Sequence, residues 1–498
     1  MKKLGDKELR DKILELTKEY SKRQHKRQFP SWLREDEKFV PGITPVPYAA
    51  RVFTDEEVVA AVNSTLDFWL TLGPEGEAME RELAQFLGIR KSLLVNSGSS
   101  ANLVAFSTLT SPLVEPQRRL RPGDEVITCA AGFPTTIAPI IQNNCVPVFL
   151  DNDAKTGNID VSKLEEAYVE GKTKAVMVAH TLGNPFDLGK VLQFCKQYNL
   201  WLIEDNCDAL GCSYSMPSSL AKKLGRHENS ISLKEVDDLT TRWTGTWGDL
   251  STQSFYPPHH LTMGEGGAVN ISGSIKLKRP AESFRDWGRD CWCASGKDNT
   301  CEKRFMWQLG ELPLGYDHKY TYSHLGYNLK PLDIQAAIGR VQLKRLPDFI
   351  EARKKNWEYL RQGLDSLSEY FEFALPTHAI EWTPKGFLWD SSGCQTECSW
   401  FGFMMRVRPE SPFTHTELAK HLEKNKIGNR MLFGGNMLRQ PVMVQLAKDA
   451  PDSFRIIGNL KGADTLMNQA LFLGTYPGLT TAMLNYEIDV IQQYTKSF

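Results

Sequence analysis

Between about residues 55 and 340, short apolar runs alternate with segments that have helical periodicity. Runs of this length predict buried strands, and the patterned segments between them predict helices. The predicted strands are 92–96, 125–128, 147–150, 175–179 and 201–205. The predicted helices are 101–109, 135–142, 161–170 and 189–198. This alternation predicts an α/β fold in which helices cover both faces of a large, mostly parallel sheet.

The length of 498 residues exceeds one typical hydrophobic core, so we expect two packed domains. Residues 1–50 predict a charged N-terminal helix at 5–27, followed by an extended, proline-rich lead-in. Residues 51–345 are expected to form the large α/β domain, and 346–498 a smaller C-terminal α+β domain. Helices at 334–346 and 347–367 should lead into the second domain, which includes a predicted strand at 400–407. The polar segment 215–244 predicts a surface insertion in the large domain.

The composition is that of an ordinary globular protein, with 41% apolar and 24% charged residues. The formal net charge of -1 gives no electrostatic reason to expect nucleic acid or membrane binding. The N-terminus carries Lys2, Lys3 and Asp6 and has no apolar signal segment, so a cytoplasmic location is expected. In that compartment the ten cysteines are expected to be thiols, metal ligands or catalytic groups.

Three segments place small or charged residues where predicted strands end. NSGSSAN at 96–102 opens a helix whose N-terminus suits a phosphate. IEDNCD at 203–208 places Asp205 where a carboxylate can hold a pyridinium nitrogen protonated. GFPT at 132–135 offers Phe133 for stacking on a ring. Each signal alone is weak, because a helix cap or a core aromatic explains the same residues.

In this order, the segments resemble the large domain of the DegT/DnrJ/StrS sugar aminotransferases. These are fold type I, aspartate aminotransferase-like enzymes of pyridoxal phosphate (PLP). The resemblance covers about residues 48–495 and includes GYNLKPLDIQAA at 326–337 and RMLFGGN at 430–436. The roles that it implies for residues of this chain are phosphate binding by Ser99, Ser100 and Ser254, ring stacking by Phe133, ring-nitrogen pairing by Asp205, and contact of Asn328 with the neighbouring subunit's phosphate. The last role implies a homodimer.

In the segment SFYPPHHLTMGEGGAV at 254–269, His259 occupies the position where this family has its cofactor lysine. Imidazole does not form the stable covalent link that lysine forms, but it transfers protons near neutral pH. The resemblance therefore implies non-covalent pyridoxamine phosphate (PMP), with His259 as base and Asp208 and Tyr256 beside it as catalytic residues. Taken without the surrounding motif, two satisfied histidines in a loop are the simpler interpretation.

Cys291, Cys293 and Cys301 form a C-x-C-x7-C pattern, and Cys207 lies two residues after Asp205. By spacing alone, a zinc site, an iron–sulfur cluster and plain reduced thiols are equally compatible with this set. Proximity of Cys207 to the cofactor favours a redox centre, because zinc has no redox chemistry.

Together, the histidine, Tyr256, Asp208 and the cysteine spacing resemble the PMP- and [2Fe–2S]-dependent sugar-nucleotide 3-dehydratases of the family. That resemblance implies Cys207, Cys291, Cys293 and Cys301 as cluster ligands. It also implies CDP-4-keto-6-deoxy-D-glucose as substrate, a role in 3,6-dideoxysugar and O-antigen synthesis, and an NAD(P)H-dependent flavin/iron–sulfur reductase as partner. The segment 215–244 departs from the pattern by lengthening the interval between Cys207 and Cys291.

Two kinds of alternative remain. One is a cluster-free GDP-4-keto-6-deoxymannose 3-dehydratase or a sugar aminotransferase, which iron content would distinguish. The other is a non-enzymatic scaffold with this fold that has lost its lysine, which would not bind PMP.

Overall fold

The structure is a computed structural model that describes residues 4–34, 38–225, 234–236, 238–293 and 296–498. Its main sheet has eight strands in the order β1-β10-β9-β5-β4-β2-β3-β17. Neighbours from β9 to β17 pair in parallel, whereas β10 pairs antiparallel with both β1 and β9. The strands are β1 (Lys91–Val95), β2 (Glu125–Cys129), β3 (Val146–Leu150), β4 (Thr173–Ala179), β5 (Trp201–Asp205), β9 (Leu250–Ser254), β10 (Gly267–Ile271) and β17 (Arg455–Ile456). The predicted mostly parallel α/β sheet is confirmed.

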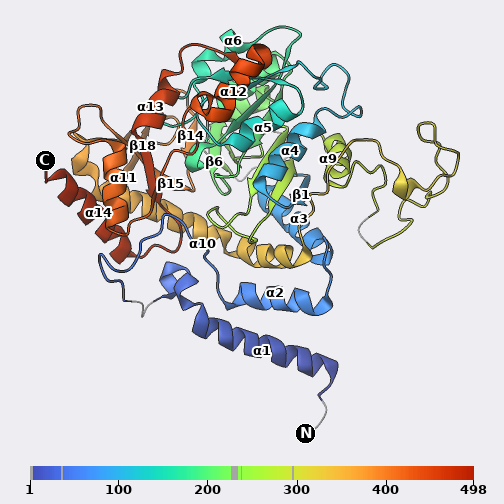
Figure 1. Cartoon of the computed structure of the whole chain (residues 1–498), viewed down its shortest axis with the longest axis horizontal. Helices are drawn as coiled ribbons and strands as arrows, with labels where there is room; N and C mark the ends of the chain where they lie inside the picture. The colour runs from blue at the N-terminus through green and yellow to red at the C-terminus, as the bar shows by residue number, and fades with distance from the viewer. Residues whose placement is uncertain (1–3, 35–37, 226–233, 237, 294–295) are drawn as a thin grey trace.

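Helices cover both faces of this sheet, as Figure 1 shows. They are α3 (Pro74–Leu87), α4 (Gly98–Thr108), α5 (Pro134–Gln142), α6 (Leu164–Ala167), α7 (Leu188–Gln197) and α9 (Lys278–Arg285). Val126 and Ile127 are neighbours in β2 but belong to separate hydrophobic clusters, because successive side chains of a strand point to opposite faces. The helix predicted at 161–170 is shorter than expected, since only α6 and a preceding 3₁₀ turn at Val161–Lys163 form there.

A single long helix, α10 (Asp333–Gly363), connects the two parts of the chain (Figure 1). The sequence predicts two helices that meet at Pro347, because proline lacks the N–H that a helix interior uses. That prediction is wrong: α10 continues through Pro347 and packs against α2 (Asp55–Asp67), α3 and α14 (Thr481–Thr495). Tertiary packing along the helix therefore outweighs the local penalty of the proline.

The C-terminal part is built on a four-stranded antiparallel sheet in the order β11-β15-β18-β16. Its strands are β11 (Phe371–Phe373), β15 (Gly402–Val407), β16 (Asn429–Met431) and β18 (Ala470–Gly474), and its helices are α11 (His415–Lys424), α12 (Pro441–Asp449), α13 (Lys461–Gln469) and α14. A hairpin of β12 (Ala379–Thr383) and β13 (Gly386–Trp389) adjoins it. Mixed helices and antiparallel strands agree with the predicted α+β pattern.

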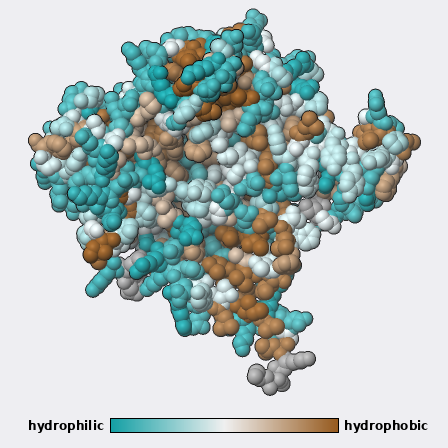
Figure 2. Space-filling view, viewed as in Figure 1, coloured by the Kyte–Doolittle hydropathy of each residue, from teal (hydrophilic) through white to brown (hydrophobic). Residues whose placement is uncertain are grey.

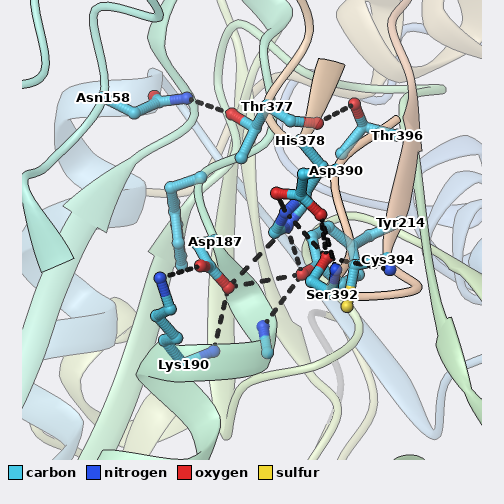
Figure 3. A network of polar contacts seen from close by, with 12 residues as sticks. Asn158, Asp187, Lys190, Tyr214, Thr377, His378, Asp390, Ser392, Cys394 and Thr396 are labelled. Atoms are coloured by element: carbon cyan, nitrogen blue, oxygen red, sulfur yellow. Dashed lines mark hydrogen bonds and ion pairs between the residues drawn. The ribbon is translucent and has the colours of Figure 1, made fainter. Parts of the chain in front are cut away.

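The polar segment 215–244 forms structure of its own. Strands β6 (Ser213–Pro217), β7 (Lys234–Val236) and β8 (Leu239–Trp243) join β14 (Gln395–Glu397) in an antiparallel sheet, and α8 (Ser218–Lys223) follows β6. Residues 226–233 and 237 of this segment lie outside the described part. Directly before this segment, Tyr214 Oη lies 2.8 Å from His378 Nε2, and His378 Nδ1 lies 3.0 Å from Asp390 Oδ2 (Figure 3). The described residues of the segment pair through β6 with β8 and β14, so this part of the segment joins a sheet with Gln395–Glu397.

The N-terminal helix α1 (Asp6–Gln24) lies alongside α2, below α10 in Figure 1. Arg10 fixes the pair by donating hydrogen bonds to Asn63 and Asp67. Leu9, Leu16 and other apolar side chains stay exposed, and Figure 2 shows an apolar patch in this region of the molecule. Across the described residues, no helix combines the length and apolar character that crossing a membrane requires.

Candidate active site

A cavity of about 630 Å³ lies where β1, β5 and β9 end at the same edge of the main sheet. Parallel α/β sheets bind ligands at this edge, because the loops after the strands diverge there. Residues from the C-terminal part, including Phe401, Arg430 and Phe472, line the opposite side. The cavity therefore lies between the main sheet and the C-terminal part, and both apolar and polar side chains line it.

Asp205 is the last residue of β5 and lines the cavity with a side chain that is only 5% exposed. Asn102 Nδ2 and Thr136 Oγ1 donate to its Oδ2 atom over 2.9 and 2.7 Å. The backbone N–H of Cys207 donates to Oδ1 over 3.2 Å. These donors stabilise a buried carboxylate in one orientation, as a partner for a protonated ring nitrogen requires.

The start of α4 forms the polar end of the cavity. Ser97 caps the helix by accepting the Ser100 N–H over 3.0 Å, and Ser97, Ser99 and Ser254 line the cavity. A Cβ atom at Gly98 would lie 2.5 Å from Cβ of Ser254, so only glycine allows the helix to approach β9 this closely. Exposed N–H groups and hydroxyls at a helix start suit a phosphate.

Two of the predicted serines differ in their surroundings. Ser99 lines the cavity as expected, whereas the Ser100 hydroxyl accepts a hydrogen bond from Ser97 Oγ over 3.0 Å and is not part of the cavity lining. Sequence reasoning missed Ser97, although its position just before the helix is a typical capping position.

Phe133 lies at the cavity and is 50% exposed, just before α5 begins. Its ring meets Phe433 edge-to-face at a centroid distance of 6.1 Å. A core aromatic, the alternative interpretation, would be buried. The half-exposed ring instead offers a surface to a planar ligand.

His259 lines the cavity together with Asp208 and Tyr256. Its Nε2 lies 3.3 Å from Asp208 Oδ1, and its Nδ1 lies 3.3 Å from the Tyr256 carbonyl oxygen. A protonated imidazole can donate to both acceptors, whereas a neutral ring can donate to only one. Its ring also packs against Phe401 at a centroid distance of 5.3 Å. The imidazole is therefore held by contacts on several sides while it faces the cavity.

The neighbouring His260 has a different environment. It is 2% exposed, and its Nε2 lies 2.5 Å from the Ser399 carbonyl oxygen. Burial lowers the pKa of His260 well below its usual value, so its ring is neutral near pH 7. His260 is thus a buried loop histidine that is bonded through Nε2 alone, with no hydrogen-bond partner for its Nδ1 among the described residues, whereas His259 faces the cavity.

Three of the four predicted cluster cysteines line pockets, and these pockets are different. Cys207 lines the main cavity, whereas Cys291 and Cys293 line a second pocket of about 340 Å³ beside α3 and α9. Cys291 Sγ accepts the Cys293 N–H over 3.5 Å, and Cys301 acts electrostatically on Cys291. No three His, Cys, Asp or Glu side chains come close enough to hold a metal within the part of the chain that the structure describes, which leaves out residues 294–295 of this loop.

The thiols also differ in acidity. Burial raises the pKa of the Cys207 thiol well above its usual value. Burial acts in the same direction on Cys293, but hydrogen bonds from Thr300 and Cys291 lower the pKa of Cys293 to about 7. Cys291, Cys293 and Cys301 are therefore neighbours on one loop, whereas Cys207 lies apart from them at the main cavity.

Asn328 is exposed and is not part of the cavity lining. Its Oδ1 accepts a hydrogen bond from Lys330 Nζ over 2.7 Å, and its backbone bridges to Asp286. The role expected for it requires a second subunit, so that role stays a prediction.

Two further cavity residues come from distant segments. Tyr48 lies in the segment before α2. The Arg430 guanidinium lies over the Tyr48 ring, 4.2 Å from its centroid. Arg430 donates to the Asn429 carbonyl oxygen over 2.7 Å, and no carboxylate pairs with it among the described residues. The 430–436 motif pointed to Arg430, whereas no sequence signal pointed to Tyr48.

The geometry of this cavity agrees with a family match over most of the chain. Residues 53–492 match the DegT/DnrJ/EryC1/StrS aminotransferase family, and the chain belongs to that family. It is similar to the lipopolysaccharide biosynthesis protein RfbH of Salmonella typhimurium, with 47% identity over 92% of this chain and 93% of that protein. It is also similar to the dTDP-4-dehydro-2,6-dideoxy-D-glucose 3-dehydratase of Saccharopolyspora spinosa, with 42% identity over 97% and 92% of the two chains.

A solved structure of the GDP-4-keto-6-deoxy-D-mannose-3-dehydratase of E. coli with bound hydrated PLP has the same fold. Its TM-score is 0.70 at 24% identity, over 89% of this chain and 98% of that one. The predicted fold type I, aspartate aminotransferase-like architecture is thus confirmed.

Proposed function

We propose that this protein is a PMP-dependent sugar-nucleotide 3-dehydratase that removes the C3 hydroxyl of CDP-4-keto-6-deoxy-D-glucose. The observation that carries the proposal is that His259 faces the same cavity as Asp205. By the sequence resemblance, position 259 corresponds to the cofactor lysine of the family. A family member with histidine there cannot hold PLP covalently at this position, so ordinary transamination is disfavoured. Two similar proteins are named as sugar 3-dehydratases, which supports this choice of reaction.

The cavity residues fit PMP. The hydrogen-bonded carboxylate of Asp205, the half-exposed ring of Phe133 and the serine-rich start of α4 match its ring nitrogen, its ring face and its phosphate. When bound, PMP supplies a primary amine and an electron-withdrawing ring. Asp205 would keep a proton on the ring nitrogen. His259 would move a proton at the C4′ carbon, with its imidazole oriented by Asp208.

Arg430 supports a nucleotide-sugar substrate. Its guanidinium lines the cavity, stacks on Tyr48 and has no carboxylate partner among the described residues. Such a group suits a diphosphate, which arginine binds through paired hydrogen bonds. The choice of CDP rests on the sequence resemblance, and the similar proteins are named for dTDP- and GDP-sugars. The nucleotide base is therefore a part of the proposal that needs its own test.

The proposal includes a [2Fe–2S] cluster and a reductase partner, both of which rest on the resemblance. Cys207, Cys291, Cys293 and Cys301 would hold the cluster, which would supply single electrons. The described thiols do not form one ligand set, so assembly requires the 291–301 loop and Cys207 to come together. An NAD(P)H-dependent flavin/iron–sulfur reductase would be the electron source.

A homodimer is also proposed. Asn328 is exposed on the surface of its own chain, where it is available to a second copy. Apolar side chains on and beside α1 and α2, including Leu9, Leu16 and Phe68, are exposed as well and suit a covering partner. Light scattering of the purified protein would test this, since a monomer at micromolar concentration would contradict it.

The experiment that tests the proposed function follows deuterium at C4′ of PMP. Protein loaded with the labelled cofactor is mixed with CDP-, dTDP- or GDP-linked 4-keto-6-deoxysugar, and loss of label to water is measured. We expect loss with the CDP-sugar, and far slower loss in the matched variant His259→Asn. Loss only with the GDP-sugar would favour the cluster-free dehydratases, and no PMP binding would favour a scaffold.

A further inference from the structure

A buried arginine lies directly behind the loop that carries His259. Arg353 comes from the middle of α10 and is 1% exposed. Its Nη2 donates to the His259 carbonyl oxygen over 3.0 Å and to the Pro258 carbonyl oxygen over 3.4 Å. Its Nη1 donates to the Trp400 carbonyl oxygen over 3.1 Å. One guanidinium therefore joins the His259 loop of the large domain to the segment that enters β15 of the small domain.

The charge of Arg353 is an unusual feature of this core. Among the described residues no carboxylate forms an ion pair with it, and its neighbouring acceptors are backbone carbonyl oxygens. Burial lowers the pKa of Arg353 to about 10, which still leaves the group charged at neutral pH. Burying a cation without a paired anion is costly, so packing alone does not account for an arginine at this position.

The segment that Arg353 reaches also touches the imidazole itself. Phe401 follows Trp400 directly, and its ring packs against His259 at 5.3 Å. A second hydrogen bond joins the same two segments, because His260 Nε2 lies 2.5 Å from the Ser399 carbonyl oxygen. Arg353 thus contacts the backbone of His259 on one side and the backbone of Trp400 and Phe401 on the other.

We propose that Arg353 is a positioning residue that fixes the His259 imidazole between Phe401 and Asp208. The proposal rests on His259 being the proton-transferring group of the proposed function. The fork of the guanidinium is essential to it, because two nitrogens must reach two separate backbone segments at once. Lysine has a single nitrogen at its end and can replace only part of these contacts.

The test compares Arg353→Met and Arg353→Lys with Arg406→Met as matched control. Arg406 is a buried arginine in β15 whose guanidinium reaches Glu372 and Gln469 and makes no contact with the His259 loop. The first measurement uses protein without cofactor. Carbethoxylation of His259 by diethylpyrocarbonate at pH 7 is followed by peptide mass mapping. We expect several-fold faster modification in Arg353→Met, an intermediate rate in Arg353→Lys, and the wild-type rate in Arg406→Met.

The second measurement is C4′ deuterium loss from bound PMP, with kcat and KM determined separately. A misplaced base should lower kcat by about tenfold or more, because catalysis depends steeply on the geometry of the reacting groups. PMP affinity should change little, and Arg353→Lys should recover part of the rate. If Arg353→Met does not fold, Arg353→Lys carries both measurements by itself.

The outcomes separate this proposal from the proposed function. Unchanged His259 reactivity and unchanged kcat in the Arg353 variants would overturn the positioning role. Loss of thermal stability and PMP affinity with a normal rate per bound PMP would also overturn it, since that result describes structural support alone. If wild-type protein shows no C4′ exchange with any sugar nucleotide, the proposed function fails, while the modification rates still test whether Arg353 holds His259.

Discussion

Nε2 of His259 and Oδ1 of Asp208 lie 3.3 Å apart in the cavity between the main sheet and the C-terminal part. Asp208 follows β5, whereas His259 follows β9, so the pairing depends on the parallel neighbours β5 and β9 ending at one edge of the sheet. A carboxylate at this distance can accept a hydrogen bond from the imidazole and so orient the ring. The pair therefore holds the His259 imidazole in one orientation, in which it faces the cavity.

His259→Lys should permit covalent attachment of PLP at position 259 and abolish dehydration as the main activity. The reason is that lysine at this position reaches the site where the family holds its cofactor, and its amine forms the link that imidazole does not. Borohydride reduction followed by peptide mapping checks the prediction. Bound PLP with no label at residue 259 would show that position 259 does not correspond to the cofactor lysine of the family.

Asp205→Asn should retain PMP but slow C4′ deuterium loss by about tenfold or more, because a neutral amide does not keep the ring nitrogen protonated. The amide oxygen can still accept from Asn102 and Thr136, whereas the amide NH2 group cannot accept from the Cys207 N–H, so most of the bonding at this position should remain. Exchange at the wild-type rate would show that Asp205 is not the partner of the ring nitrogen.

Cys293→Ser should remove iron from anaerobically purified protein while PMP binding and C4′ deuterium loss persist. Cys293 lines the pocket beside α3 and α9, which is separate from the cavity that Asp205 and His259 line. Iron analysis should give about two iron atoms per wild-type chain if the cluster is [2Fe–2S]. Iron-free wild-type protein that still forms the deoxygenated sugar with reductase would contradict the proposed cluster.

Glu487→Gln should stabilise the protein increasingly as the pH rises. Glu487 in α14 is fully buried, neither carboxylate oxygen has a hydrogen-bond partner among the described residues, and burial raises its pKa well above 4.5. Above pH 4.5 the folded state keeps this proton and the unfolded state loses it, so wild-type stability falls as pH rises toward the folded pKa.

The difference between Glu487→Gln and wild type should therefore be small at pH 4 and grow by about 1.4 kcal/mol per pH unit above pH 5. Urea unfolding at several pH values measures it. A constant difference across this range would show that Glu487 ionises in the folded protein as freely as in the unfolded one.

The sequence was most informative where local pattern and tertiary structure agree. The predicted strand 201–205 has the same bounds as β5, in which the apolar run 201–203 is followed by Glu204 and by Asp205 at the end of the strand. His259, Asp205 and Phe133 were found through the order of their motifs, and all three line one cavity. No single motif among them would have sufficed.

Other features depend on contacts that sequence spacing does not encode. Pro347 predicted a helix break that packing of α10 prevents. Ser97 both caps α4 and lines the cavity, and this double role depends on the three-dimensional turn before the helix. The surroundings of Arg353 became evident only once α10, the His259 loop and the Trp400 segment were in contact.

The most direct test of the central claim is incorporation of ¹⁸O from water at C3 of CDP-4-keto-6-deoxy-D-glucose. Protein loaded with PMP is used without reductase, so reversible loss of the C3 hydroxyl is observed alone. The account predicts incorporation by wild-type protein and its loss in His259→Asn, which keeps the cavity but cannot act as the base. No incorporation by PMP-loaded wild-type protein, or equal incorporation by both proteins, would contradict the account.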